Sequence, residues 1–346
     1  MEITSVYITA DNVGIGSGGG IVTLNEIEAL RQLHSNVEVL SAKELGIAGD
    51  SSPFLYDVVA SAKVWEILKS CKITHAHFYS GTFTQTVRML KLHGVKVSYT
   101  CPAHDRKVSI EEFGRLGLEY PYKHISDDKL FELFIAGVKE ADLVIAPSKL
   151  AASFLSSIGC ENVKVIPHGC DLPERTAYLP KEFGVSYLGQ TGPDKGISYL
   201  IQAWALLNYT DCSLTLAGRG TETLRDYISR NINCGKYNIK GFVGNTSEIY
   251  NNCSVYVQPS VCESFGLEVL EALAHARPVI ISAGAGASEL IQDEIHSPDQ
   301  NKPSVGSVTK LPIGFVVQPK DIRALAEKID WCKKNQHLLA GMGQRG

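Results

Sequence analysis

The chain has 346 residues, of which 44% are hydrophobic and 20% charged, and its formal net charge at pH 7 is −4. These values are typical of a soluble globular protein, and the length predicts two domains. Neither half of the chain is basic, which argues against a nucleic-acid-binding protein. No apolar run is long enough to span a bilayer and the amino terminus has no signal-peptide pattern, so we expect a cytoplasmic protein. The nine cysteines lack Cys-x-x-Cys spacing and predict neither a disulfide framework nor a zinc site.

The first half of the chain alternates between predicted strands and helices. Strands are expected at residues 3–9, 37–40, 73–78, 95–100, 143–146 and 163–166, and helices at residues 21–33, 63–71, 82–92, 131–141 and 147–158. Residues 107–130 show no clear period and are expected to form a mobile segment, of the kind that serves as a lid or a binding loop. This alternation predicts a parallel sheet that binds ligands outside the carboxyl ends of its strands.

A glycine-rich loop, DNVGIGSGGG, follows the first strand at residues 11–20. Gly14, Gly16 and Gly19 satisfy the G-x-G-x-x-G spacing, so an NAD-binding dehydrogenase is a competing hypothesis. Two observations count against it. The loop begins several residues past the strand, and Ser41 stands where an acidic residue should bind the ribose.

A second polar cluster, CPAHDR, follows the strand at residues 95–100. It places His104 and Asp105 at the carboxyl edge of the same predicted sheet. A histidine–aspartate pair at a strand end can serve either a binding site or a loop hydrogen bond, and the residues alone leave both readings open.

The second half repeats the strand–helix alternation. Strands are expected at residues 185–188, 213–217, 239–242, 255–258, 279–282 and 314–317, and the helices include residues 246–252 and 321–334. Lys195 lies in a glycine turn directly before a helix, where an ammonium group and a helix amino terminus can act on one anion. Arg219 lies in the turn after the strand at residues 213–217. Residues 295–311 read as a polar insertion.

The stretch QPSVCESFGLEVLEALAHARPVI, residues 258–280, carries two glutamates at the end of a strand and on the helix that follows. On a continuous helix Glu263 and Glu271 would lie about 12 Å apart, too far for the carboxylate pair of a glycosidase. They suit two separate hydroxyl-bearing parts of one long ligand. Between them, Gly266 and the helix amino terminus offer N–H groups to an anion. A simpler reading makes Glu263 a helix-dipole residue and Glu271 a surface residue.

Glu263 to Leu267, followed by Glu271, resembles the signature of the family 4 retaining glycosyltransferases, which have the two-domain GT-B fold. Further segments also resemble the family, so that the resemblance covers nearly the whole chain. They are the glycines at 18–20, His104 in CPAHDR, ADLVIAPSK at 141–149, Lys195-Gly196, AGAGASEL at 283–290 and GMGQRG at 341–346. It implies an α/β architecture of two Rossmann-like domains facing a central cleft. The implied parts are an acceptor-binding domain at 1–168, a linker at 169–183, a nucleotide-sugar-binding domain at 184–335 and the start of a crossover helix at 336–346.

The resemblance also implies roles for individual residues. Glu263 contacts the donor sugar, Glu271 binds the ribose hydroxyls, and His104 orients the donor or the acceptor. The glycine loop, with Gly19, faces the donor diphosphate. The remaining implied donor contacts are the backbone amides of Phe265, Gly266 and Leu267, the ammonium group of Lys195, and Phe242 and Val243 beside the nucleotide base.

One position departs from the family pattern. An arginine usually follows the first glycine of the turn before Lys195, and this chain has Gln190 there. A neutral amide cannot supply the missing charge, so either the donor binds differently or another cation compensates, for which Arg219 is the candidate.

The resemblance implies a metal-independent transfer of a hexosyl group from a nucleotide-diphosphate sugar to an acceptor hydroxyl, with retention of configuration and without a further cofactor. No Asp-x-Asp metal motif lies beside the proposed site, and no protein nucleophile stands out. The acceptor would be a glycan, a lipid-linked molecule or a small molecule, and lipid acceptors would bring the protein to a membrane surface. The alternatives are a GT-B sugar-nucleotide epimerase, a phosphorylase-like enzyme, or a catalytically weak nucleotide-sugar-binding partner subunit, for which Gln190 is the best argument.

Overall fold

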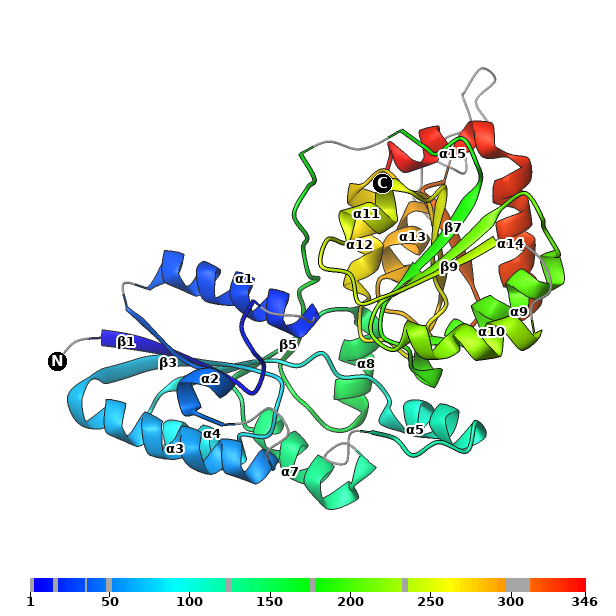
Figure 1. Ribbon diagram of the computed structural model, residues 1–346. Helices are drawn as coiled ribbons and strands as arrows, with labels where there is room; N and C mark the ends of the chain where they lie inside the picture. Colours follow the sequence, from blue (N-terminus) through cyan, green and yellow to red (C-terminus); the bar gives the residue numbers. More distant parts are fainter. Residues whose placement is uncertain are drawn as a thin grey trace. The chain divides into compact units, whose positions relative to one another are not determined.

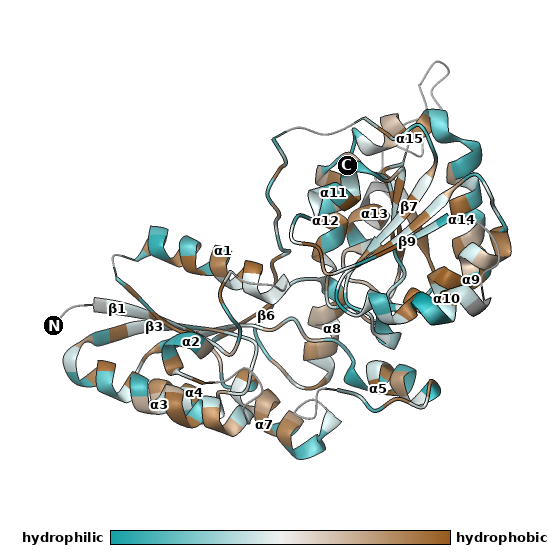
Figure 2. Cartoon of the chain, viewed as in Figure 1, coloured by the Kyte–Doolittle hydropathy of each residue, from teal (hydrophilic) through white to brown (hydrophobic). Residues whose placement is uncertain are grey.

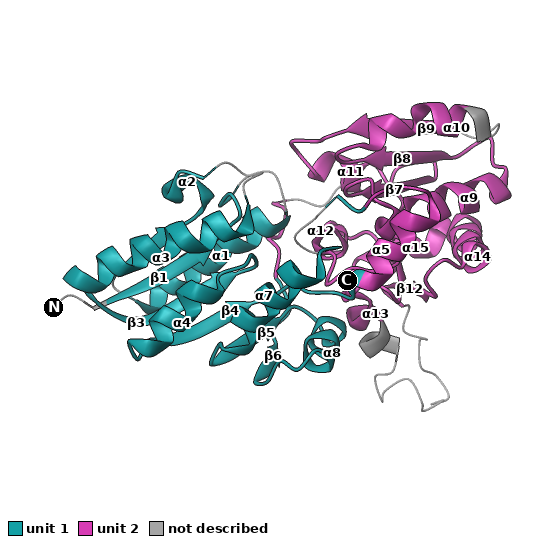
Figure 3. Ribbon diagram, turned by 90° about the horizontal axis from the view of Figure 1, so that it is seen from below, with its two compact units in different colours: residues 1–106, 120–168 teal, residues 107–119, 169–346 magenta. Residues whose placement is uncertain are grey.

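The structure is a computed structural model that describes residues 3–14, 18–34, 36–47, 52–121, 126–174, 178–231, 236–295 and 312–346. The chain forms two compact units (Figures 1 and 3). Unit 1 comprises residues 1–106 and 120–168, and unit 2 comprises residues 107–119 and 169–346. Residues 107–119, which we expected in the first domain, therefore pack with the second unit.

Unit 1 is built on a six-stranded parallel sheet with the strand order β2-β1-β3-β4-β5-β6. The chain leaves β1 toward β2 on one side and builds the other strands on the opposite side, so the switch point of the sheet lies between β1 and β3. The strands are β1 (Ile3–Thr9), β2 (Val37–Leu40), β3 (Lys72–Tyr79), β4 (Lys96–Thr100), β5 (Leu143–Ala146) and β6 (Val163–Val165). The helices are α1 (Gly18–Leu33), α2 (Ala42–Leu45), α3 (Pro53–Ser70), α4 (Thr84–Leu92), α7 (Asp128–Lys139) and α8 (Lys149–Ser157).

Unit 2 is built on a second six-stranded parallel sheet, with the strand order β12-β11-β10-β7-β8-β9. This is the doubly-wound order of dinucleotide-binding folds, and its switch point lies between β7 and β10. The strands are β7 (Gly184–Leu188), β8 (Ser213–Ala217), β9 (Lys236–Gly241), β10 (Val255–Gln258), β11 (Val279–Ser282) and β12 (Gly314–Val317). The helices are α5 (Arg106–Arg115, nearly all in this unit), α9 (Ile197–Leu207), α10 (Arg225–Asn231), α11 (Ser247–Asn251), α12 (Leu267–Ala274), α13 (Ser288–Ile295), α14 (Ile322–Lys334) and α15 (Gln336–Gly343), with 3₁₀ turns η1 (Pro193–Lys195) and η2 (Thr221–Leu224).

The sheet of unit 2 is buried on both faces. Val255 and Val257 of β10 face one hydrophobic cluster, while Tyr256 between them faces another, as the two-residue repeat of a strand requires. α14 turns Leu325 and Ile329 inward and alternates hydrophobic and hydrophilic residues along its length (Figure 2). Most of its stability comes from packing this apolar face.

Each strand that the sequence predicts is present, with small shifts at its ends. The helices differ more. α3 begins at Pro53, ten residues before its predicted start at 63, because proline is well suited to the first helical position. α5 was not predicted, since the residues that it buries are the polar Ser109 and Glu112, so no apolar period marks it. Residues 336–343 form α15, and the predicted insertion at 295–311 lies almost wholly outside the described residues.

Candidate functional site

Unit 2 places Lys195 and Glu263 at the switch point of its sheet. β7 and β10 are paired neighbours. Lys195 ends the turn η1 that follows β7, and Glu263 follows β10 at the same edge. Ligands of open α/β sheets bind at such a point, outside the carboxyl ends of the strands.

A glycine fixes the turn that carries Lys195. Gly196 has a φ of 70°, and a Cβ atom at this position would lie 2.0 Å from the carbonyl oxygen of Pro259. Only glycine tolerates both the left-handed backbone and this close approach. The Lys195-Gly196 pair in the sequence is therefore a geometric requirement for bringing the turn against the segment after β10.

Backbone hydrogen bonds hold the segment that carries Glu263 from both sides. The amide of Val261 donates to the carbonyl of Asp194 at 2.7 Å, and the amide of Glu263 donates to the carbonyl of Gly284 at 2.9 Å. The amide of Ala287 donates to the carbonyl of Phe265 at 2.8 Å. The turn after β7 and the AGAGASEL segment after β11 thus position Glu263 between them.

Lys195 and Glu263 form an ion pair. Burial alone would lower the pKa of the Lys195 ammonium group, but the carboxylates of Glu263 and Asp194 raise it, so the amine stays protonated. Glu268, in the first turn of α12, differs because burial and the charge of Glu263 raise its pKa to about 7. The sequence did not single out Glu268, because its spacing is that of any acidic residue at a helix start.

The amino end of α12 completes this group. Gly266, with a φ of 99°, precedes the first helical residue Leu267, where backbone N–H groups have no acceptor within the helix. Phe265 is buried in the core, so its predicted role is confined to its backbone. One turn along, Glu271 accepts a hydrogen bond of 2.7 Å from the Tyr250 hydroxyl, which orients its carboxylate.

The turns after β7, β8 and β9 bring Gln190, Arg219 and Phe242 into one neighbourhood. The amide of Thr191, next to Gln190, donates to the carbonyl of Arg219 at 3.0 Å, and the Arg219 guanidinium lies 5.3 Å from the centroid of the Phe242 ring. The Phe242 side chain is 61% exposed. Val243 instead packs partly against the core of unit 2. The Arg219 backbone therefore lies against the turn that carries Gln190, and its guanidinium lies over the Phe242 ring.

The two remaining predicted residues, Gly19 and His104, lie in unit 1. Gly19 is in the first turn of α1, where a Cβ atom would lie 3.1 Å from Asp11 Oδ2 and 3.4 Å from the Tyr79 hydroxyl. Asp11 follows β1 and Tyr79 ends β3, the strands that flank the switch point of unit 1. His104 follows β4 at the same edge of this sheet. Burial raises the pKa of the Asp11 carboxyl, and neither Asp11 nor Tyr79 was singled out from the sequence.

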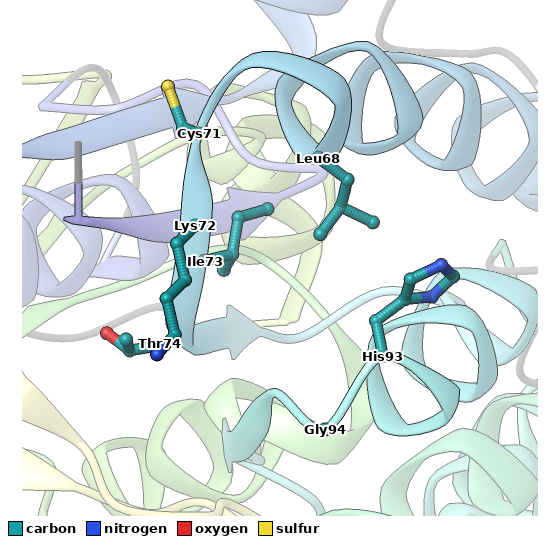
Figure 4. A pocket seen from close by; sticks show the side chains of 7 residues that line it. All are labelled: Leu68, Cys71, Lys72, Ile73, Thr74, His93 and Gly94. Atoms are coloured by element: carbon teal, nitrogen blue, oxygen red, sulfur yellow. The ribbon is translucent and has the colours of Figure 1, made fainter. Parts of the chain in front are cut away.

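A cavity of about 390 Å³ lies elsewhere in unit 1 (Figure 4). Its lining includes Lys72 and Ile73, which begin β3, and Gly94, which precedes β4. It therefore lies at the amino-terminal edge of the sheet, opposite the edge that carries Gly19 and His104. Across the described ranges, no group of three or more His, Cys, Asp or Glu residues is arranged to hold a metal ion.

Two family models match the chain. One, described as glycosyl transferases group 1, covers residues 174–346, and the other, described as glycosyltransferase family 4, covers residues 16–174. The chain belongs to the family 4 glycosyltransferases. The family resemblance that rested on ESFGL and Glu271 is thereby confirmed.

Curated relatives of this glycosyltransferase match part of its length. An uncharacterized glycosyltransferase of Methanocaldococcus jannaschii is 35% identical over 121 residues, which are 32% of this chain and 30% of the relative. The capsular polysaccharide biosynthesis glycosyltransferase CapM of Staphylococcus aureus is 29% identical over 174 residues, 49% of this chain and 41% of CapM. The chain thus aligns with less than half the length of either relative.

Solved structures resemble this glycosyltransferase over nearly its whole length. Sucrose-phosphate synthase from Thermosynechococcus elongatus has a TM-score of 0.73 at 17% identity, covering 99% of this chain and 92% of that chain. HepE from Anabaena, in complex with UDP and glucose, has a TM-score of 0.64 at 19% identity, with the same coverage of 99% and 92%. At these identities the likeness shows the fold, and the GT-B fold predicted from the sequence is confirmed. No described helix is both long enough and apolar enough to cross a membrane.

Proposed function

We propose that this chain transfers a hexosyl group from a nucleotide-diphosphate sugar to an acceptor hydroxyl, with retention of configuration and without a metal ion. The observation that carries the proposal is the Lys195–Glu263 pair at the switch point of unit 2, beside the amino end of α12. A protonated amine and a helix amino terminus suit a diphosphate. Carboxylates on either side of them suit the hydroxyls of a sugar and a ribose.

In this proposal the ligand replaces the ion pair. The donor diphosphate takes the place of Glu263 on the Lys195 ammonium group, and the Glu263 carboxylate then accepts hydrogen bonds from sugar hydroxyls. Glu271, oriented by Tyr250, accepts hydrogen bonds from the ribose hydroxyls. Arg219 supplies the positive charge that Gln190 lacks, and the exposed ring of Phe242 offers a surface for the base.

The transfer step follows from charge placement. As the bond between the sugar carbon and the diphosphate oxygen breaks, negative charge grows on the diphosphate, where Lys195 and the helix N–H groups stabilise it. The acceptor hydroxyl attacks on the same face of the sugar, and its proton passes to the departing diphosphate. His104 orients the donor or the acceptor. The named relatives support a nucleotide-sugar donor, because HepE was solved with UDP and glucose and a Mycobacterium tuberculosis relative is named as a GDP-mannose-dependent mannosyltransferase.

A melting-temperature screen of the purified chain tests this function. UDP-, GDP-, ADP- and TDP-sugars are added singly, with NAD as the control and with or without EDTA. A ligand that binds the folded state raises the melting temperature by mass action. We expect one class of nucleotide sugar to raise it with and without EDTA, and then to be consumed when acceptors are supplied. A shift with NAD alone, or no shift with any nucleotide sugar, would contradict the proposal.

A further inference from the structure

Helix α5 comes from the first half of the chain but belongs to unit 2 (Figure 3). The chain enters this unit at residue 107, leaves it after residue 119 and returns at residue 169. α5 is polar, and the residues that it buries are Ser109 and Glu112. Burying polar side chains is unfavourable unless they are paired, so their partners show what holds the helix in place.

Glu112 makes the main contacts that attach α5 to the rest of unit 2. Its side chain is 1% exposed, and Lys320 Nζ lies 2.5 Å from Glu112 Oε1. The Tyr199 hydroxyl donates to Glu112 Oε2 at 2.8 Å, and Arg115 Nε reaches the same oxygen at 3.4 Å while its guanidinium lies over the Tyr199 ring. Burial alone would raise the pKa of Glu112, but the hydrogen bonds from Lys320 and Tyr199 lower it below its ordinary value, so the carboxylate is charged.

Ser109 connects α5 to the turn that carries Lys195. Its buried hydroxyl donates to Asp194 Oδ2 at 3.3 Å. Asp194 also accepts, through its carbonyl oxygen, the backbone hydrogen bond from Val261 in the segment before Glu263, and its carboxylate helps to keep the neighbouring Lys195 protonated. One residue thus touches α5, the Lys195 turn and the Glu263 segment.

We propose that Ser109 and Glu112 are positioning residues of the nucleotide-sugar site. Glu112 holds α5 on unit 2, and Ser109 then fixes the carboxylate of Asp194 in the turn that carries Lys195. The inference rests on the proposed function for the identity of the ligand. It adds that the site depends on residues from the first half of the chain, and that a diphosphate bound at Lys195 steadies α5 in return.

The first experiment measures hydrogen exchange of the α5 amides in the full chain, without ligand and with UDP, GDP or ADP. We expect Glu112→Gln to speed exchange in α5 several-fold without ligand, while exchange in α10 stays unchanged. In the unmodified protein the nucleotide that binds should slow exchange in α5. Unchanged α5 exchange in Glu112→Gln would overturn the attachment, and that result does not depend on any ligand.

The second experiment compares nucleotide affinity in Ser109→Ala with that in Ser229→Ala. Ser229 is an exposed serine of α10 whose hydroxyl donates to the carbonyl of Asp226 in the same helix. Losing one hydrogen bond should weaken binding of the nucleotide by about three- to tenfold in Ser109→Ala, measured by calorimetry well below the melting temperature. Ser229→Ala should bind as the unmodified chain does. A Ser109→Ala protein that melts lower but binds nucleotide unchanged would show a merely structural role and overturn the proposal. If no nucleotide binds the unmodified chain, the proposed function fails, and the exchange result on Glu112→Gln still decides the attachment.

Discussion

At the scale of single residues, the two glutamates of the central stretch have different surroundings. Glu263 is paired with the Lys195 ammonium group, whereas Glu271 is held by the neutral Tyr250 hydroxyl. Glu268 lies between them in sequence and titrates near neutral pH because burial and Glu263 disfavour its charge. Three carboxyl groups on one short stretch therefore have three distinct environments.

Replacing Glu271 with alanine should weaken nucleoside-diphosphate binding by about 10- to 100-fold, since hydrogen bonds to a charged group contribute roughly 1.5–3 kcal/mol. Calorimetry with the nucleotide selected in the melting screen measures the change. Glu248→Ala, at an exposed position of α11, is the matched control. Equal affinities for Glu271→Ala and the unmodified chain would contradict the ribose role.

The Glu263→Ala variant should lower kcat more than it lowers affinity for the nucleoside diphosphate. In the proposed binding mode the Glu263 side chain contacts the sugar, which the free nucleotide lacks. Removing it also frees Lys195 from its ion pair, so nucleotide affinity is expected to hold or rise. Parallel loss of turnover and nucleotide affinity would place Glu263 at the nucleotide instead.

The affinity for a nucleotide sugar should rise as the pH falls from 8 to 6. With a pKa of about 7, Glu268 becomes neutral over this range and then repels a bound diphosphate less. A nucleotide sugar is the suitable probe because its diphosphate does not titrate near neutral pH. Glu268→Gln should flatten the dependence, and a slope that persists in this variant would assign it to another group.

At the scale of elements, tertiary contacts decide where helices begin. Asp57 of α3 is buried, and its carboxylate accepts hydrogen bonds from the amides of Gln85 and Thr86, at 2.7 and 2.9 Å, in the first turn of α4. It caps a helix from outside, because Phe83 at the N-cap position provides no side-chain hydrogen bond. α7 has an ordinary local cap instead, since the Asp127 side chain accepts from Lys129 and Leu130.

The two caps provide a matched test. Asp57→Ala leaves the buried amide of Thr86 and the amide of Gln85 without this partner and should lower the free energy of unfolding by about 2–4 kcal/mol. Asp127→Ala removes an exposed cap and should cost about 1 kcal/mol. Urea denaturation of both variants measures the difference. Equal losses would mean that the carboxylate of Asp57 contributes no more than a surface cap.

At the scale of the whole molecule, several carboxylates with lowered pKa values connect elements that are distant in sequence. In unit 1, burial would raise the pKa of Glu26, but hydrogen bonds from His77, Thr100 and Tyr7 lower it below its ordinary value. Hydrogen bonds from Lys91 and from the amide of Val97 likewise lower the pKa of Asp142. In unit 2, hydrogen bonds from Lys320 and Tyr199 lower the pKa of Glu112. Each group binds protons more weakly in the folded protein than in the unfolded chain.

The melting temperature should therefore fall steeply as the pH drops below about 4.5. A carboxyl whose pKa is lowered by folding stabilises the fold above its ordinary pKa, which is 4.5 for Glu and 3.8 for Asp. That stability is lost as the pH falls through the folded value. Glu112→Gln should reduce the acid dependence of unit 2, and an unchanged profile would show that Glu112 adds no net stability.

The sequence by itself determined the order of the strands, most of the helices and the residues at the strand ends. The hydrophobic repeat, the glycine turns and the ESFGL stretch with Glu271 are local signals. Lys195, Glu263 and Glu271 could therefore be named as candidate site residues before the fold was known. Only the tertiary structure decided that α5 belongs to unit 2, that Lys195 pairs with Glu263, and that Glu268 titrates near neutral pH. These properties depend on burial and on neighbouring charges brought together from distant parts of the chain, which no local pattern records.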